Sequence, residues 1–265
     1  MMCNNQACGT VLLCRLRTVL HILILDCPNS ELIVRRVSML GPNILAVRTV
    51  PVMRMPGRRL ARAGFAVLPP FPARVSKDAA TLENWIAMYQ GEAGVKQALL
   101  LAGGVASPVG DFHSSMQLME TGLFDKAGFT RLHVAGHPEG NRDIDPHGGT
   151  ALVDEAMRWK QAFSETTDAE MAIATQFAFD AKPIIKWADD LAAAGITLPI
   201  HIGIAGPAKL QTLIKFAIAC GVGPSLKVLQ KRAMDVTKLL LPYEPTEVVS
   251  QLAAHKAAKG RGAAA

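Results

Sequence analysis

From about residue 95 onward, the sequence alternates short apolar runs with longer amphipathic segments, and this alternation restricts the fold more than any other feature. Short runs that are almost wholly apolar are typical of parallel strands covered by helices on both faces. The predicted strands are Gln97 to Leu101, Arg131 to Ala135, Met171 to Phe177 and Leu198 to Ile204. The helices predicted after them are Ser114 to Phe124, Thr150 to Glu165, Pro183 to Ala194 and Ala208 to Cys220. The order predicts repeated βα units.

Two more strands are predicted upstream, at Ile44 to Val50 and Phe65 to Leu68, joined by the segment Arg58 to Ala63. A further helix, about Ser225 to Leu241, follows without an intervening strand. A chain of 265 residues suits one large α/β domain. Six strands are predicted in all, whereas eight would close a TIM (β/α)8-type barrel.

The N-terminal part differs in composition from the rest of the chain. Residues 1–75 contain ten arginines and no lysine, with only Asp26 and Glu31 as acids, so this part has a net charge of +8, against +6 for the whole chain. Four of the five cysteines also lie there, without the spacing of a zinc site or a disulfide framework. We expect free thiols in a reducing, cytoplasmic compartment. The predicted division is an Arg/Cys-rich segment at 1–45, a barrel domain at 46–254 and a basic, alanine-rich tail at 255–265.

Composition also bears on the partners. The apolar run from Val19 to Leu25 is too short to span a bilayer and contains His21, so no membrane association is expected. Aromatic residues make up only 5% of the chain, which speaks against stacking on nucleic acid. An anion-binding role for the arginine-rich segment stays open as an alternative, and so does a homo-oligomeric state.

The stretch Leu132 to Ile144, LHVAGHPEGNRDI, places polar side chains where a predicted strand ends. His137, Glu139 and Asn141 could present an imidazole, a carboxylate and an amide to one crevice at the strand-end edge, where parallel α/β folds carry their sites. The alternative is that Asn141 serves the following turn and His137 is a surface residue. The glycine-bearing loop Ala102 to Gly104 also follows a predicted strand.

Three other side chains are candidates with ordinary alternatives. Gln176 interrupts an apolar strand, either as a hydrogen-bonded core residue or as a ligand contact in the barrel mouth. Lys160 lies on a predicted helix, where a lysine is usually solvated. Phe216 would ordinarily be a core residue. The chain contains no GxGxxG, P-loop, HExxH or GxSxG motif, and no metal site is predicted.

Three stretches in this order resemble the methylenetetrahydrofolate reductase family of flavoproteins, which are TIM barrels. They are VAGHPEG (134–140), ATQFAFDA (174–181) and AAGITLPIHIGIAGPAKLQTLIKFAIACGVG (193–223), and the resemblance extends from about Phe65 to Ala254. It implies that FAD takes a hydride from NADH or NADPH and passes it to 5,10-methylenetetrahydrofolate, a folate of one-carbon metabolism, giving 5-methyltetrahydrofolate. The flavin carries that chemistry, and the protein orients the reactants.

The resemblance also implies a set of flavin-binding residues. His137 and Asn141 match family residues near the flavin in the strand-end loop. Gly103 and Gly104 match the loop after the preceding strand. Lys160 matches a helix lysine that contacts the phosphates or the ribityl chain of the cofactor.

For the substrate, Gln176 matches the family's folate-contacting glutamine in its TQF motif, and Phe216 matches an aromatic residue that packs on folate or nicotinamide. The chain departs from the family pattern at the proton donor, a glutamate in an EFFPP-like motif on the first strand. No segment before residue 65 contains that motif, and Glu31 lacks its context. We therefore assign no catalytic residue.

Compared with the family pattern, the first and the last strand are not recognised, so we expect a TIM (β/α)8-type barrel that is either complete or incomplete at these two strands. These departures leave alternatives to a reductase activity. One is an inactive or truncated family member that binds flavin or folate without turnover, and another is the arginine-rich anion-binding scaffold. A related hypothesis is that residues 1–45 come from a shifted reading frame or a truncated gene and are not the family's own N-terminus.

Overall fold

The computed structural model describes residues 66–205 and 243–262, the strands at 10–12, 19–26 and 33–40, and the single positions 58, 61, 62, 210, 213 and 214. The chain divides into two compact units. Unit 1 comprises Met1–Arg15, Asn43–His133 and Asp168–Glu170, and unit 2 comprises Leu16–Pro42, Val134–Thr167 and Met171–Ala265. Each unit is described by itself below.

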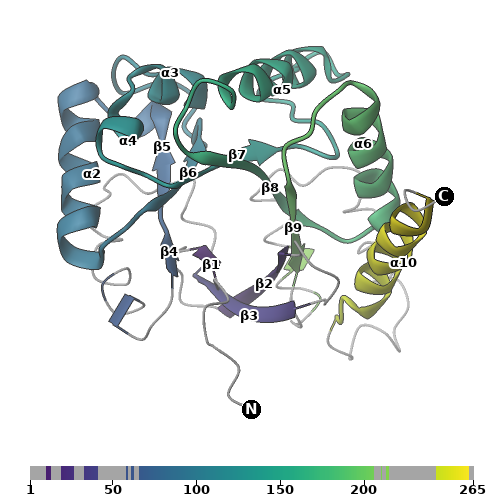
Figure 1. The fold of residues 1–265 in the computed structure, drawn as a ribbon. Helices are drawn as coiled ribbons and strands as arrows, with labels where there is room; N and C mark the ends of the chain where they lie inside the picture. The colour runs from purple at the N-terminus through teal and green to yellow at the C-terminus, as the bar shows by residue number, and fades with distance from the viewer. Residues whose placement is uncertain are drawn as a thin grey trace. The chain divides into compact units, whose positions relative to one another are not determined.

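A five-strand parallel sheet with alternating helices confirms the predicted α/β class (Figure 1). Its strands, in spatial and chain order, are β5 (Pro70–Pro72), β6 (Gln97–Leu101), β7 (Arg131–Gly136), β8 (Glu170–Ala178) and β9 (Ile200–Ala205). The helices between them are α2 (Ala79–Ala93), α3 (Ser115–Glu120), α4 (Leu123–Lys126), α5 (Ala151–Phe163) and α6 (Ala181–Ala193). The strands predicted from continuous apolar runs correspond to β6, β7, β8 and β9.

In unit 1, the sequence prediction was wrong about one helix and missed a helix and a strand. One helix at Ser114 to Phe124 is wrong, because Gly122 adopts a left-handed φ of 64° and separates α3 from α4. Helix α2 was not predicted, although Asp78 caps it by accepting a hydrogen bond from Thr81 N at 2.7 Å. Strand β5 was not predicted because prolines at both of its ends disfavour a strand.

An aromatic cluster explains why β5 belongs to the core of unit 1. The Phe71 ring of this strand packs edge-to-face against Tyr89 and Phe124, with centroids 5.5 and 5.3 Å apart. Phe129 meets Phe124 in the same manner at 5.2 Å. Burying such rings stabilises a fold by more than their apolar area alone, so packing overrides the poor strand propensity of the two prolines.

The N-terminal strands extend the architecture in a way that the sequence did not predict. In unit 2, β2 (Val19–Asp26) lies between β9 and β3 (Ile33–Leu40) and pairs antiparallel with both. The apolar run at 19–25 is therefore a strand. In unit 1, β1 (Thr10–Leu12) pairs parallel with β4 (Ala66–Leu68), the strand predicted at Phe65 to Leu68. The strand predicted at Ile44 to Val50 lies outside the described residues.

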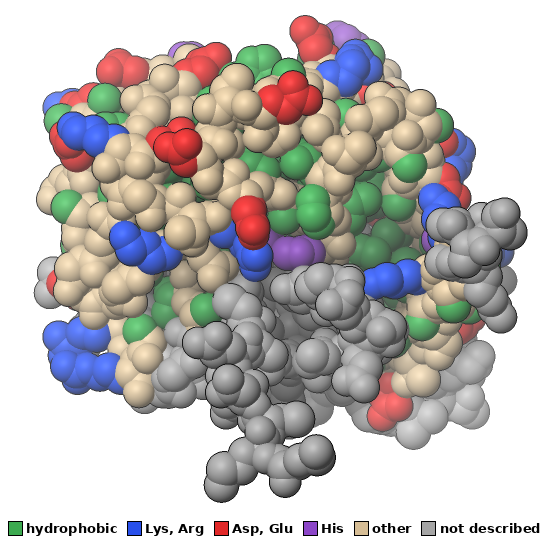
Figure 2. All heavy atoms as spheres, viewed as in Figure 1, with side chains coloured by type: hydrophobic (Ala, Val, Ile, Leu, Met, Phe, Trp, Pro, Cys, Tyr) green, Lys and Arg blue, Asp and Glu red, His purple; other side chains and the backbone are tan. Residues whose placement is uncertain are grey.

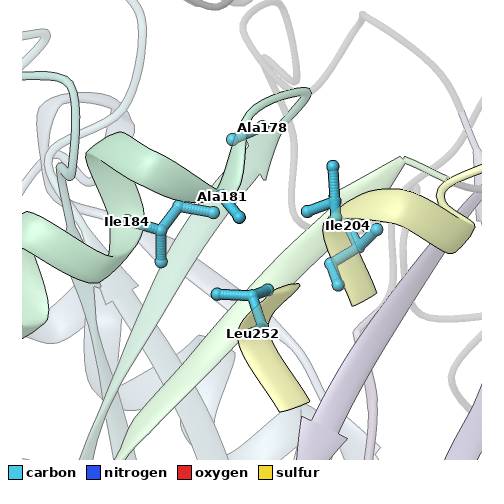
Figure 3. Close-up of a cluster of buried hydrophobic side chains, with 6 residues drawn as sticks. Ala178, Ala181, Ile184, Ile204 and Leu252 are labelled. Atoms are coloured by element: carbon cyan, nitrogen blue, oxygen red, sulfur yellow. The ribbon is translucent and has the colours of Figure 1, made fainter. Parts of the chain in front are cut away.

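The C-terminal helix α10 (Thr246–Gly262) crosses the boundary predicted at residue 254 and packs on α6. Figure 1 shows α5, α6 and α10 one after another beside the strands of unit 2. The apolar cluster that joins α10 to β8, α6 and β9 is drawn in Figure 3, and its buried members are Ala178, Ala181, Ile184, Ile204, Val248 and Leu252. Asp189 on α6 also pairs with His255 at 3.2 Å and with Lys259.

The described surface carries charges of both signs. Figure 2 shows acidic and basic side chains interspersed on the displayed face, without an extended patch of one sign outside the grey residues. Over the described ranges, no helix is both long enough and apolar enough to cross a membrane.

Gly136 ends β7 where no larger side chain fits. A Cβ there would overlap Ile173 Cγ2 and lie 2.8 Å from Trp187 Cη2. We expect Gly136→Ala to lower the free energy of unfolding of the purified protein by about 1–3 kcal/mol, the usual cost of overpacking, measured by urea denaturation.

Gly91, inside α2, is the matched control because nothing lies within 4 Å of a Cβ added there. Gly91→Ala should raise the free energy of unfolding by up to about 1 kcal/mol, since alanine is the better helix former. Equal stability of the two variants would contradict the packing assigned to Gly136.

Candidate functional site

A tight turn follows β7 in unit 2 and carries the first two candidate residues. The amide of Gly140 donates to the carbonyl oxygen of His137 at 3.0 Å, and Gly140 adopts a left-handed φ of 75°. The turn brings Asn141 Nδ2 to 3.4 Å from His137 Nδ1. The structure therefore places together the imidazole and the amide that the sequence proposed as flavin neighbours.

The hydrogen bonds of Asn141 determine which nitrogen of His137 carries the proton. Asn141 Oδ1 accepts from the backbone amide of Asp143 at 2.9 Å, so its Nδ2 group is the one that faces the imidazole. An amide NH2 only donates, so His137 Nδ1 accepts and Nε2 carries the proton of the neutral ring. The Asn141 side chain therefore both stabilises the following turn, which was the alternative prediction, and contacts His137.

Lys160 is buried on α5, contrary to the usual solvated position of a helix lysine. Its side chain is 6% exposed, and its ammonium donates to the carbonyl oxygen of Ala135 on β7 at 3.0 Å. Of the lysines and arginines whose side chains are described, it is the only buried one. No carboxylate among the described residues pairs with it, and two of its three N–H groups have no acceptor there.

The sequence did contain a signal for this burial. Val153, Met157 and Lys160 recur at intervals of four and three residues, and these are the buried positions of α5. Asp145 fixes the start of the helix, because its carboxylate accepts from the amides of Leu152 and Val153 at 3.0 and 3.1 Å. The lysine therefore occupies a core position of an amphipathic helix.

Burial alters the proton affinities of both basic groups. Loss of hydration lowers the pKa of Lys160 from 10.5 to about 8. The pKa of His137 falls from 6.5 to about 4, first because of burial and second because of the positive charge of Lys160. At neutral pH the loop therefore presents a neutral imidazole beside a protonated amine.

Gln176 lies on β8, the strand next to β7, and is exposed. The alternative of a buried core glutamine is therefore wrong. Gln176 sits where the pairing of β8 with β9 is irregular, between Ala174 and Phe177. Because parallel strands end at the same edge of a sheet, the carboxyl-terminal part of β8 and the loop after β7 belong to one edge of unit 2.

The glycine loop belongs to unit 1. Gly103 follows β6 with a left-handed φ of 94°, and a Cβ there would lie 3.1 Å from Pro72 Cβ. Gly104 is exposed. The sequence missed the role of Arg74, whose guanidinium donates to the carbonyl oxygens of His113 at 3.1 Å and Val105 at 3.3 Å, bracing this loop.

The remaining predictions are not tested by the described residues. Phe216 lies outside them. No group of three His, Cys, Asp or Glu side chains in the described part of the chain could hold a metal ion. No protein-family model matches the chain.

A groove of about 430 Å³ is lined by residues of α5, of α6 and of the loop after β7, but not by any residue assigned to flavin or folate. Its floor includes Trp187, Leu191 and Ile196, and charged side chains of both helices border it. Pro138, Glu139 and Gly140 of the loop after β7 also line it, so the carboxylate candidate Glu139 belongs to this groove, whereas His137 and Asn141 do not line it.

The lowered pKa of His137 predicts an acid-sensitive fold. Between pH 6.5 and about 4 the unfolded chain binds more protons at this residue than the folded one, so the free energy of unfolding falls as the pH falls. The full shift corresponds to about 3 kcal/mol.

The measurement is urea denaturation at a series of pH values for the wild type and for His137→Gln. The variant should lose less stability than the wild type on acidification below pH 6.5 and should match its pH dependence above it. His113→Gln, at an exposed histidine, is the control that should follow the wild type. Parallel curves for the wild type and His137→Gln would show that His137 is not held neutral.

Proposed function

We propose that the protein catalyses the FAD-dependent reduction of 5,10-methylenetetrahydrofolate to 5-methyltetrahydrofolate by NADH or NADPH. The observation that carries the proposal is the buried ammonium of Lys160, which has no anionic partner among the described residues, beside the neutral His137 at a strand end. The family resemblance of VAGHPEG and ATQFAFDA supplies the identity of the cofactor and of the substrate.

The residues present fit a dinucleotide flavin. FAD contains an anionic diphosphate, and the two unsatisfied N–H groups of Lys160 could donate to its oxygens, which would offset the cost of burying the charge. The N–H at Nε2 of His137 and the amide of Asn141 offer neutral hydrogen bonds to the polar edge of a flavin or its ribityl chain. FAD, when bound, accepts a hydride from the nicotinamide and delivers it to the folate.

Two more elements would complete the site in this proposal. Gly103 and Gly104 would line the flavin through their backbone, since a glycine loop permits close approach of a ligand. Gln176, exposed on β8, would hydrogen-bond the folate, and Phe216 would pack on the folate or the nicotinamide.

The proposal includes a (β/α)8-type barrel built on the five parallel strands. Support comes from the five parallel strands with alternating helices, since this succession is the repeating unit of such barrels. In that arrangement the loops after the strands surround one ligand site.

A second candidate is a family member that binds flavin or folate without turnover. The missing EFFPP-like glutamate favours it, because a positioned general acid typically contributes about 10² to 10⁴ in rate. The two candidates differ in turnover and agree in binding.

An absorbance experiment on the full chain separates them. The protein is reconstituted with FAD, freed of excess cofactor and treated anaerobically with NADH or NADPH, and then with 5,10-methylenetetrahydrofolate. Bleaching of the flavin band and its recovery with the folate are expected. Retained flavin that does not complete this cycle would favour the binding protein, and failure to retain FAD would defeat both.

Lys160→Met tests the assignment of the buried amine. We expect the dissociation constant of FAD to rise at least about tenfold, since a charge-assisted hydrogen bond is lost. Stability should change by no more than about 1 kcal/mol, because removal of an unpaired buried charge offsets the lost bond to Ala135. The measurements are FAD titration by fluorescence and urea denaturation.

Lys182→Met, at an exposed lysine of α6, is the matched control and should leave the affinity for FAD unchanged. A Lys160→Met protein that is folded and binds FAD as tightly as the wild type would contradict a role in holding the cofactor.

Gln176→Ala tests the substrate contact. We expect the rate of flavin reoxidation by subsaturating folate to fall about tenfold, the effect of losing a neutral hydrogen bond of about 1.4 kcal/mol, while the affinity for FAD stays within twofold. Gln251→Ala, on the partly buried glutamine of α10, is the control without an effect on either. Equal losses of folate reactivity and FAD affinity would contradict the proposed division of roles.

A further inference from the structure

A β-bulge lies within the TQF stretch. Ala174 pairs with His201 and Phe177 pairs with Gly203, so two residues of β8, Thr175 and Gln176, stand opposite Ile202 alone. An uninterrupted ladder would place Gln176 opposite Gly203, and the extra residue gives that position to Phe177. Bulges redirect side chains in this way and are frequent beside active sites.

The hydroxyl of Thr175 bridges the two strands at the bulge. Its Oγ1 accepts from the backbone amide of Gly203 at 3.0 Å and donates to the carbonyl oxygen of Gln176 at 2.9 Å. Both backbone groups lie where the register shift interrupts the regular ladder. The side chain therefore takes over hydrogen bonds that the ladder does not supply there.

Gly203 permits the close approach on which this bridge depends. A Cβ on Gly203 would lie 2.6 Å from the carbonyl oxygen of Thr175 and 3.0 Å from the carbonyl carbon of Gln176. Any larger residue would push the two strands apart. The glycine and the hydroxyl thus act together on the same two residues of β8.

The residues that follow Gln176 on β8 are buried and hold its backbone in place. Phe177 and Ala178 are each 4% exposed, and the Phe177 ring packs edge-to-face on Phe179 with centroids 5.5 Å apart. Gln176, the second residue of the bulge and the neighbour of the buried Phe177, is exposed. Its backbone is held on one side by the Thr175 bridge and on the other by the buried phenylalanine.

We propose that Thr175 is a positioning residue that aims the amide of Gln176 at the folate substrate. This inference rests on the proposed function, because it concerns the residue assigned there to the folate. Thr175 acts through the backbone of Gln176 and does not itself contact flavin or folate. A hydroxyl on a branched or unbranched side chain can make the bridge, whereas an isosteric methyl group cannot.

The test compares Thr175→Val with Thr175→Ser in the FAD-loaded protein. For Thr175→Val we expect KM for 5,10-methylenetetrahydrofolate to rise about tenfold, the effect of losing about one hydrogen bond. The dissociation constant of FAD and the rate of flavin reduction by the nicotinamide should stay within twofold of the wild type. Thr175→Ser should retain the wild-type KM. Hydrogen exchange of the Gly203 amide should be faster in Thr175→Val alone.

Two controls keep the outcome decisive. Thr166→Val removes a hydroxyl from a turn, where it donates to the carbonyl oxygen of Phe163 at 2.8 Å, and should leave KM unchanged. Thr175→Ala replaces the valine variant if that protein does not fold, with the same expected rise in KM.

An unchanged KM in Thr175→Val, or an equal rise in Thr175→Ser, would overturn the proposal. If the wild type itself does not transfer electrons to the folate, the proposed function fails. In that case the exchange of the Gly203 amide still tests the bridge, and equal exchange in the wild type and Thr175→Val would overturn it separately.

Discussion

A buried ammonium group governs the chemistry of the loop at the carboxyl end of β7. Lys160 donates one hydrogen bond to Ala135 and has no anionic partner among the described residues. Burying a charge in this state costs free energy, which is why its pKa falls to about 8. Burial and, as the smaller cause, the positive charge of Lys160 lower the pKa of His137 and keep its imidazole neutral. An anionic partner for the two remaining N–H groups of Lys160 would offset the cost of burying its charge.

The packing of α5 explains why the protein tolerates such a group. Val153 and Met157 bury the same face of the helix as Lys160, and Asp145 satisfies two amides at its start. The helix is therefore held by apolar contacts and a carboxylate cap, independently of the amine. A position that packing has already secured can carry a functional charge that does not itself stabilise the fold.

Strand β8 presents a polar side chain, Gln176, by means of a β-bulge. On β8 the bulge at Thr175 and Gln176 replaces regular ladder bonds by a side-chain bridge, and Gly203 leaves the room that this requires. In both places backbone geometry at a strand end presents a polar group, by a turn at Gly140 and by a bulge at Gln176. Both lie in unit 2, on adjacent parallel strands.

The sequence by itself determined the βα succession, because continuous apolar runs such as Gln97–Leu101 have no stable place except a sheet covered on both sides. It also located the polar loop of His137 and Asn141, since glycine and proline are strong sequence signals for the end of a strand. Only the tertiary structure decided that Lys160 donates to Ala135, that Gln176 is exposed and that β2 pairs antiparallel with β9. These outcomes depend on residues distant in the chain, such as Ala135 for Lys160 and Gly203 for the bulge. Local periodicity assigns a residue to a helix or a strand, but its burial and its hydrogen bonds are set by which neighbours the fold brings to it.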